Sequence, residues 1–357
     1  MKLKIRLSLI FIFLFAIGCS ETPPEESTAP DSTDQSITIS KNDPPSDVNA
    51  PTPTPSGEIT STRPFHLLGT IELINRSSFP TETIEDWISS ATSMMKDQDS
   101  NLLIVIYPLG EVTNKNDSSD WEVDLHKVIM SQKEITGLLK EIDQWFSKDA
   151  CMARNTDLKI RELETYREFL ESGAAVQTQV MLCQRTRLVM MGLPASTPLE
   201  EHKISILKEI YHAFQHDLGD SRCTQRAEIT EENNSEWMVE GAAHYFATFL
   251  SLQGGSPSNF QDTILKPGSM AARLEGTDIN RGSIHLKGAV GLLLLVKQGW
   301  MEQTIILDGT LFQNCLRETV YGFRTPEVSH IKTTWHLIQE KDGAFIFLDG
   351  AIGSKFP

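Results

Sequence analysis

The stretch from residue 20 to residue 63 limits where this chain can build a folded core. It is rich in Pro, Ser, Thr, Asp and Glu, includes the alternating run from Pro51 to Pro55, and has few large apolar side chains. Such a composition buries too little apolar surface to offset the entropy lost on folding, so we expect a solvated, semi-rigid spacer. Folding is therefore expected over residues 64–357, with an early portion over 64–195 and a later portion over 196–357.

Residues 1–19 have the pattern of an export signal. Basic residues precede an apolar run from Leu7 to Ile17, which is shorter than the roughly 20 residues that a membrane-spanning helix needs. The run is followed by Gly18 and Cys19, and the resulting Ala-Ile-Gly-Cys resembles the lipobox of bacterial lipoproteins. That resemblance implies cleavage before Cys19, acylation of its thiol with a chain such as palmitate, and anchoring to membrane lipid. It also implies the cell envelope as the location, at the outer membrane facing the periplasm or the exterior.

Charge and cysteine content narrow the classes of function. The formal net charge is −16, which opposes binding to nucleic acid or to an anionic lipid surface. Four cysteines follow Cys19, namely Cys151, Cys183, Cys223 and Cys315, and none of them has a metal-binding spacing. An even number in an exported chain permits two disulfides, with three ways of pairing them.

Hydrophobic periodicity predicts an α+β fold with a mixed sheet. In the early portion it predicts strands over 66–74 and 101–107, helices over 81–96, 134–146 and 157–172, and one or two strands over 175–191. The later portion is expected to be mainly helical. Helices are predicted there over 197–218, 235–253, 285–297, 310–320 and 327–340.

Polar side chains gather on one face of two of these helices. At about 100° per residue, Lys208, Glu209, His212 and His216 fall within roughly one quadrant of the helix over 197–218. On the helix over 235–253, Glu236, Glu240 and His244 form a second polar stripe. Apolar and aromatic residues border both stripes, so the two helices are expected to face each other across a buried polar site.

The two segments resemble the zinc-binding helices of gluzincin-type metallopeptidases, the class that includes thermolysin-like and aminopeptidase-like enzymes. The second segment matches the pattern Trp-x-x-Glu-Gly-x-Ala-x-Tyr-Phe, with Trp237, Glu240 and Tyr245 at fixed positions. The first segment is similar to the His-Glu-x-x-His helix, and its trailing glutamine falls on Gln215. The resemblance covers about residues 175–300 and implies a zincin-like domain.

Carried over residue by residue, the resemblance assigns roles. Glu209 would be the catalytic base that activates a zinc-bound water, and His212 and Glu240 would be zinc ligands. Tyr211, Gln215, Trp237 and Tyr245 would support the site. The bound partner would be a peptide or protein segment.

The sequence departs from the family pattern at the first ligand. Lys208 occupies that position, and a protonated amine has no lone pair to donate and repels a cation. His244 also stands where an acidic residue commonly orients the first histidine of the family. Both differences are consistent with the loss of the zinc site.

Three interpretations follow. In the first, the domain is a pseudopeptidase that has lost zinc, and Lys208 pairs with Glu240 or Glu209. In the second, a rearranged zinc site uses His212, Glu240 and His244, or the pair His212 and His216, which would place Ala213 at the position of the base. In the third, these groups are only hydrogen-bonded packing residues in a non-enzymatic structural or binding lipoprotein unrelated to peptidases.

Two further expectations concern the surroundings of the site. The stretch 180–190 is either an edge strand that would pair with an extended substrate or an ordinary core strand. His285, His330 and His336 have no ligand spacing to nearby residues, so they are weaker candidates for the site.

Overall fold

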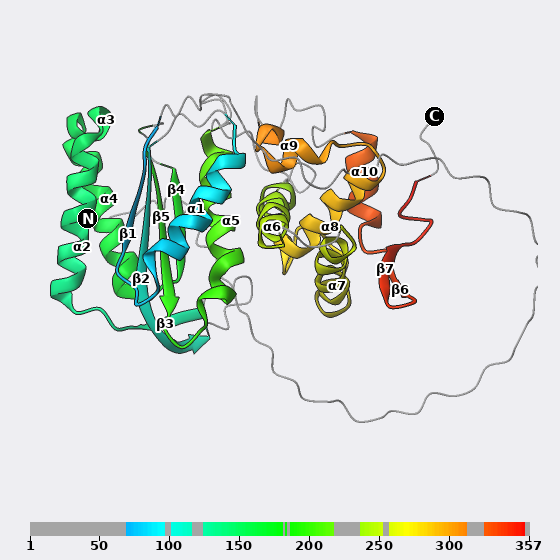
Figure 1. Cartoon of the computed structure of the whole chain (residues 1–357), viewed down its shortest axis with the longest axis horizontal. Helices are drawn as coiled ribbons and strands as arrows, with labels where there is room; N and C mark the ends of the chain where they lie inside the picture. The colour runs from blue at the N-terminus through cyan, green and yellow to red at the C-terminus, as the bar shows by residue number, and fades with distance from the viewer. Residues whose placement is uncertain are drawn as a thin grey trace, which may run out of the picture. The chain divides into compact units, whose positions relative to one another are not determined.

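The computed structural model describes residues 69–96, 101–115, 124–180, 183, 186–217, 236–252, 257–312 and 325–353 (Figure 1). All of them belong to one compact unit. The expected export signal, Cys19 and the expected spacer lie outside the described residues. Among the described helices, none is both long enough and apolar enough to cross a membrane.

A mixed five-stranded sheet organises the early portion. Its strands are β1 (Ile71–Asn75), β2 (Asn101–Lys115), β3 (Asp124–Val128), β4 (Val176–Val180) and β5 (Thr186–Pro194), in the order β1-β2-β5-β4. β1 and β5 run parallel to β2, whereas β4 is antiparallel to β5 and β3 is antiparallel to β2. The mixed sheet predicted from the sequence is therefore confirmed.

Helices cover both faces of this sheet. Alternate residues of β2 point to opposite faces, so Leu103 and Val105 join one core while Leu102 and Ile104 join another. The first core contains α2 (Gln132–Lys148), α3 (Ala150–Arg154) and α4 (Thr156–Ser172). The second contains α1 (Thr81–Met94) and α5 (Leu199–Asp217), which lie on the other face of the sheet (Figure 1).

The later portion is mainly helical, as predicted. It contains α6 (Glu236–Ser251), α7 (Pro257–Glu275), α8 (Ile284–Lys297), α9 (Gln303–Leu307), the 3₁₀ turn η3 (Thr310–Phe312) and α10 (Pro326–Thr334). A hairpin of β6 (Ile338–Lys341) and β7 (Ala344–Phe347) follows. The later helices share one core with α1 and α5, so α5 joins the sheet to the helical portion.

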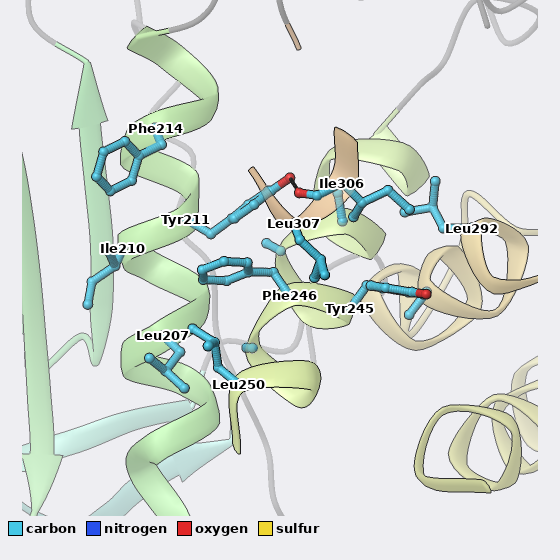
Figure 2. Packing of buried hydrophobic residues seen from close by; sticks show 14 of the residues in the cluster. Leu207, Ile210, Tyr211, Phe214, Tyr245, Phe246, Leu250, Leu292, Ile306 and Leu307 are labelled. Carbon is cyan, nitrogen blue, oxygen red and sulfur yellow. Dashed lines mark hydrogen bonds between the residues drawn. The ribbon is translucent and has the colours of Figure 1, made fainter. Parts of the chain in front are cut away.

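Figure 2 shows how α5 makes this connection. Ile210 and Phe214 point to one side of α5, while Tyr211 points to the other, toward Phe246 of α6. The rings of Tyr211 and Phe246 lie 4.7 Å apart between centroids, and the Tyr211 hydroxyl donates a 2.6 Å hydrogen bond to the carbonyl of Ile306. Because α5 is apolar on more than one side, its polar stripe is enclosed by packed elements.

One predicted helix needs correction: the helix over 327–340 is wrong after Trp335, because α10 ends at Thr334 and the hairpin begins at Ile338. The helix α7 and the strand β3 were not predicted. Both alternatives for the stretch 180–190 are seen in part. Val180 ends β4 at the edge of the sheet, whereas Thr186 to Met190 belong to β5, which lies between β2 and β4 and is buried on both faces.

Candidate functional site

The polar stripe of α5 is buried. Lys208 is only 1% exposed, and Glu209, His212 and Gln215 are also buried. From α6, Glu240 and His244 are buried as well. Removing charged groups from water costs several kcal/mol for each ion unless a partner compensates. The contacts between these side chains therefore decide whether the cost of burying their charges is compensated.

Lys208 and Glu240 form a buried ion pair between α5 and α6. The Nζ of Lys208 lies 2.8 Å from Oε2 of Glu240. The other carboxylate oxygen, Oε1, lies 3.4 Å from Nε2 of His212. One carboxylate thus faces an ammonium and an imidazole at once, which brings three of the motif positions, Lys208, His212 and Glu240, together.

Gln215 fixes the orientation of His212. The amide nitrogen of Gln215 donates to the carbonyl of Val239 on α6 at 2.8 Å, so its oxygen must face the histidine. That oxygen lies 2.7 Å from Nδ1 of His212, which therefore donates a proton to it. Nε2 is then the nitrogen that faces Glu240. In metal sites the same device, a hydrogen bond from one ring nitrogen, aims the other at the ion.

The charges of these groups follow from their burial and their neighbours. Burial alone would raise the pKa of Glu240, but the nearby Lys208 and His212 lower it well below its usual range. Burial alone would lower the pKa of His212, but the charge of Glu240 and its contact with the ring, with a smaller contribution from Glu209, raise it overall. Glu240 is therefore a carboxylate, held between the Lys208 ammonium and the His212 ring.

Two further histidines, His244 and His285, lie beside Lys208. The rings of His244 on α6 and His285 on α8 lie 5.2 Å apart between centroids, in an edge-to-face arrangement. Burial and the Lys208 charge lower the pKa of His244 to about 3, and burial, Lys208 and His244 lower the pKa of His285 well below its usual range. Both rings are neutral, and Nδ1 of His244 has no hydrogen-bond partner within the described parts of the chain.

His285 lies beside the site although it has no ligand spacing in the sequence. A close contact between glycines explains why it belongs there: a Cβ on Gly241 would lie 2.3 Å from the carbonyl carbon of Gly288. Trp237, one turn before Gly241, contacts Gly291, so α6 and α8 are antiparallel at this crossing. One turn in the other direction, the same crossing places His244 opposite His285. A helix spacing within one segment could not reveal this contact.

Of the residues that the resemblance assigns a supporting role, Gln215 contacts His212, and the other three are buried in the surrounding core. Trp237 and Tyr245 are fully buried, and the ring of Tyr245 meets that of Phe260 on α7 edge to face at 4.9 Å. Tyr211 links α5 to α9 through the hydrogen bond described above. The side chain of His216, the alternative ligand, lies outside the described residues, as do Cys223 and Cys315.

The residues present do not fit a zinc ion at the position that the motif resemblance implies. A catalytic zinc site needs three donor atoms around one point. Here the ammonium of Lys208 takes the first position and contacts the Glu240 carboxylate that would be the third ligand. Among the described residues, only Asp149, Cys151 and Cys183 bring three potential ligand atoms within 4.8 Å of one another, so His212, Glu240 and His244 do not form such a set.

The cysteines that the structure describes form a disulfide. Cys151 and Cys183 are bonded, which agrees with one of the pairings left open by the sequence.

Comparison with known proteins finds no match for this chain among protein-family models, curated proteins or solved structures.

Proposed function

We propose that this chain is an envelope-anchored pseudopeptidase, a gluzincin-like domain that has lost zinc and binds peptide or protein segments without cleaving them. The observation that carries the proposal is the buried ion pair in which Lys208 Nζ lies 2.8 Å from Glu240. The cation of the side chain stands where the family resemblance expects a metal and satisfies the carboxylate that would otherwise bind it. No hydrolytic step is derived for the site.

The contacts of His212 support the loss of zinc from a former metal site more than a chance packing of polar residues. His212 keeps the orientation that a metal ligand needs, with Nδ1 held by Gln215 and Nε2 turned toward Glu240. The change at position 208 is then sufficient to abolish the metal site, because the remaining donors are still in place.

Metal content tests the proposal directly. The full-length chain and its Lys208→His variant would be purified without chelator or reductant, and zinc would be measured by elemental analysis. We expect less than a tenth of an equivalent in the wild type and close to one equivalent in the variant. Stoichiometric zinc in the wild type would overturn the proposal and support a rearranged active site, whereas a metal-free variant would favour a domain unrelated to peptidases.

A second variant tests whether any zinc gained by Lys208→His comes from the new imidazole or from the loss of the lysine charge. Lys208→Leu removes the ammonium and supplies no donor atom, so it should stay metal-free. His212→Ala in the Lys208→His background should lose the zinc that the single variant gains. Peptide binding would then be measured with an unstructured peptide library on the wild-type chain, and intact peptides recovered from the complex would support binding without cleavage.

A further inference from the structure

The disulfide lies next to a carboxylate that a metal ion could share. Asp149 caps α3, and its Oδ1 accepts hydrogen bonds from the backbone nitrogens of Cys151 at 2.8 Å and Met152 at 2.9 Å. Asp149 makes no ion pair with a basic side chain among the described residues. One of its carboxylate oxygens and the two sulfurs of Cys151 and Cys183 form the compact group noted above, within 4.8 Å of one another.

The bridge is reachable from solvent. A pocket of about 430 Å³ opens beside it and is lined by both cysteines, Arg154, Arg161 and the start of α4. Cys151 is partly exposed, whereas Cys183 is only 2% exposed. A reductant or a metal ion approaching through the pocket therefore meets the sulfur of Cys151 first.

Polar and charged side chains surround the sulfur of Cys151. The side-chain amide of Asn155 lies 3.8 Å from it and donates a weak hydrogen bond. Arg154 and Arg161 line the pocket beside the bridge. The thiolate is the form of cysteine that binds metal, so binding releases the thiol protons.

We propose that Asp149, Cys151 and Cys183 form a redox-gated zinc site. A dithiol reductant transfers two electrons and two protons to the bridge, the S–S bond breaks, and the dithiol becomes its own disulfide. Zn²⁺ then displaces the two thiol protons and binds two thiolates and one carboxylate. This set leaves one position for water and suits zinc, while the oxidised bridge offers no thiolate and does not bind.

The test compares oxidised and reduced full-length chain. Reduction would use a phosphine, which takes up the oxygen of one water molecule as the bridge becomes two thiols and which competes less for zinc than a dithiol does. Zn²⁺ binding would be followed by competition with a chromogenic chelator, and Co²⁺ would report sulfur ligation through its thiolate charge-transfer absorption. We expect the reduced chain to bind one equivalent more than the oxidised chain.

Two variants assign that equivalent to the proposed residues. Cys151→Ser with Cys183→Ser should remove it and leave any binding by the other cysteines in place. Asp149→Asn keeps the capping oxygen of α3 and removes the charge, so it should raise the dissociation constant for zinc at least tenfold. Asp157→Asn is the matched control, because Asp157 lines the same pocket and lies outside the cluster; its affinity should stay within twofold of the wild type.

Three results would overturn the proposal. One is equal binding by oxidised and reduced chains. Another is undiminished binding by the double cysteine variant. The third is loss of near-ultraviolet circular dichroism on reduction, because a site that needs the fold cannot operate in an unfolded chain. None of these outcomes bears on zinc at Lys208, so this test and that of the proposed function fail independently.

Discussion

At the scale of single residues, the buried Lys208–Glu240 pair dominates the energetics of the site. Both side chains are almost wholly removed from water, so each depends on the other for compensation. Breaking such a pair by removing one partner costs about 3 to 5 kcal/mol, while replacing both partners by apolar groups is often close to neutral. Stability measurements on single and double variants can therefore detect the pair without any assumption about catalysis.

The first prediction concerns removal of the lysine charge. Lys208→Met should lower the free energy of unfolding by about 3 to 5 kcal/mol, because it leaves the Glu240 carboxylate buried without its cation. The double variant Lys208→Met with Glu240→Met should recover most of that loss. Urea unfolding at pH 7 measures both. Lys266→Met on the exposed side of α7 is the control and should change stability by less than about 0.5 kcal/mol; an equal effect in both single variants would contradict a buried pair.

The second prediction is a loss of stability in mild acid. His244 has a pKa of about 3 in the folded chain and 6.5 when unfolded, so between these values the unfolded chain binds the extra proton. Its contribution is fully present above pH 6.5 and is lost as pH falls toward 3, by at most about 1.4 kcal/mol for each pH unit. Urea midpoints between pH 7.5 and 5 should therefore fall less steeply for His244→Asn than for the wild type. Identical slopes would show that burial and the Lys208 charge do not lower the pKa of His244.

The convergence of Lys208, His212 and Glu240 could be predicted because it depends on two short helical spacings and a recognisable motif. The place of His285 could not, since it depends on where α8 crosses α6. The sequence also left open whether Lys208 pairs with Glu240 or Glu209, because both carboxylates lie within reach of a flexible lysine side chain. The structure shows the contact with Glu240, at 2.8 Å.

At the scale of elements, the crossing of α6 and α8 is the contact that shapes the site. Gly241 and Gly288 let the two backbones meet, and a Cβ on Gly288 would lie only 2.0 Å from the carbonyl oxygen of Trp237. Any side chain at either position forces the helices apart. The glycine that follows Glu240 in the motif therefore has a packing role of its own.

The third prediction tests that crossing. Gly288→Ala should destabilise the fold by about 1 to 3 kcal/mol or more, because the added methyl group meets backbone atoms that cannot move independently. Gly137→Ala is the matched control: Gly137 lies inside α2 with no atom within 4 Å of the added methyl, so helix propensity should stabilise it by about 0.5 to 1 kcal/mol. Thermal unfolding of the two variants should shift in opposite directions.

Elements with a clear period were predictable, and those set by tertiary contacts were not. The helices of the early portion match their predicted ranges within a few residues. The helix α7 was missed because it contains Pro267 followed by Gly268, a pair that normally ends a helix. Gly268 instead packs closely on Val290 of α8, and tertiary packing overrides the local preference. The β6–β7 hairpin turns at Asp342 and Gly343, both with positive φ, a signal present in the sequence.

At the scale of the whole molecule, α5 is the element shared by the sheet and the helical portion. It packs on the sheet side through Ile210 and Phe214 and on α6 through Tyr211. The α+β class and the order of an α/β portion before a helical one were predictable from the pattern of periods. The position of α5 between them follows from apolar residues on more than one of its sides, which a helical period alone does not assign to particular partners.

The fourth prediction concerns the attachment of the molecule to a membrane. If Cys19 is the acylated residue, cells fed labelled palmitate should label the wild-type chain, and Cys19→Ala should be unlabelled and released into the soluble fraction. Cys223→Ala should keep the label and serves as the control for loss of a thiol. An unlabelled wild type would remove the anchor from the proposed function and leave the proposal for the folded unit unchanged.

The buried pair of Lys208 and Glu240 also has a consequence for descent. Codons for lysine and histidine differ at the first and third bases, so under the proposed function a return to histidine by single changes passes through glutamine or asparagine. Either intermediate leaves the Glu240 carboxylate buried without a cation and without a metal. Selection for a stable fold would then oppose the first substitution on the way back to histidine. A lineage that acquired the lysine would therefore tend to keep it.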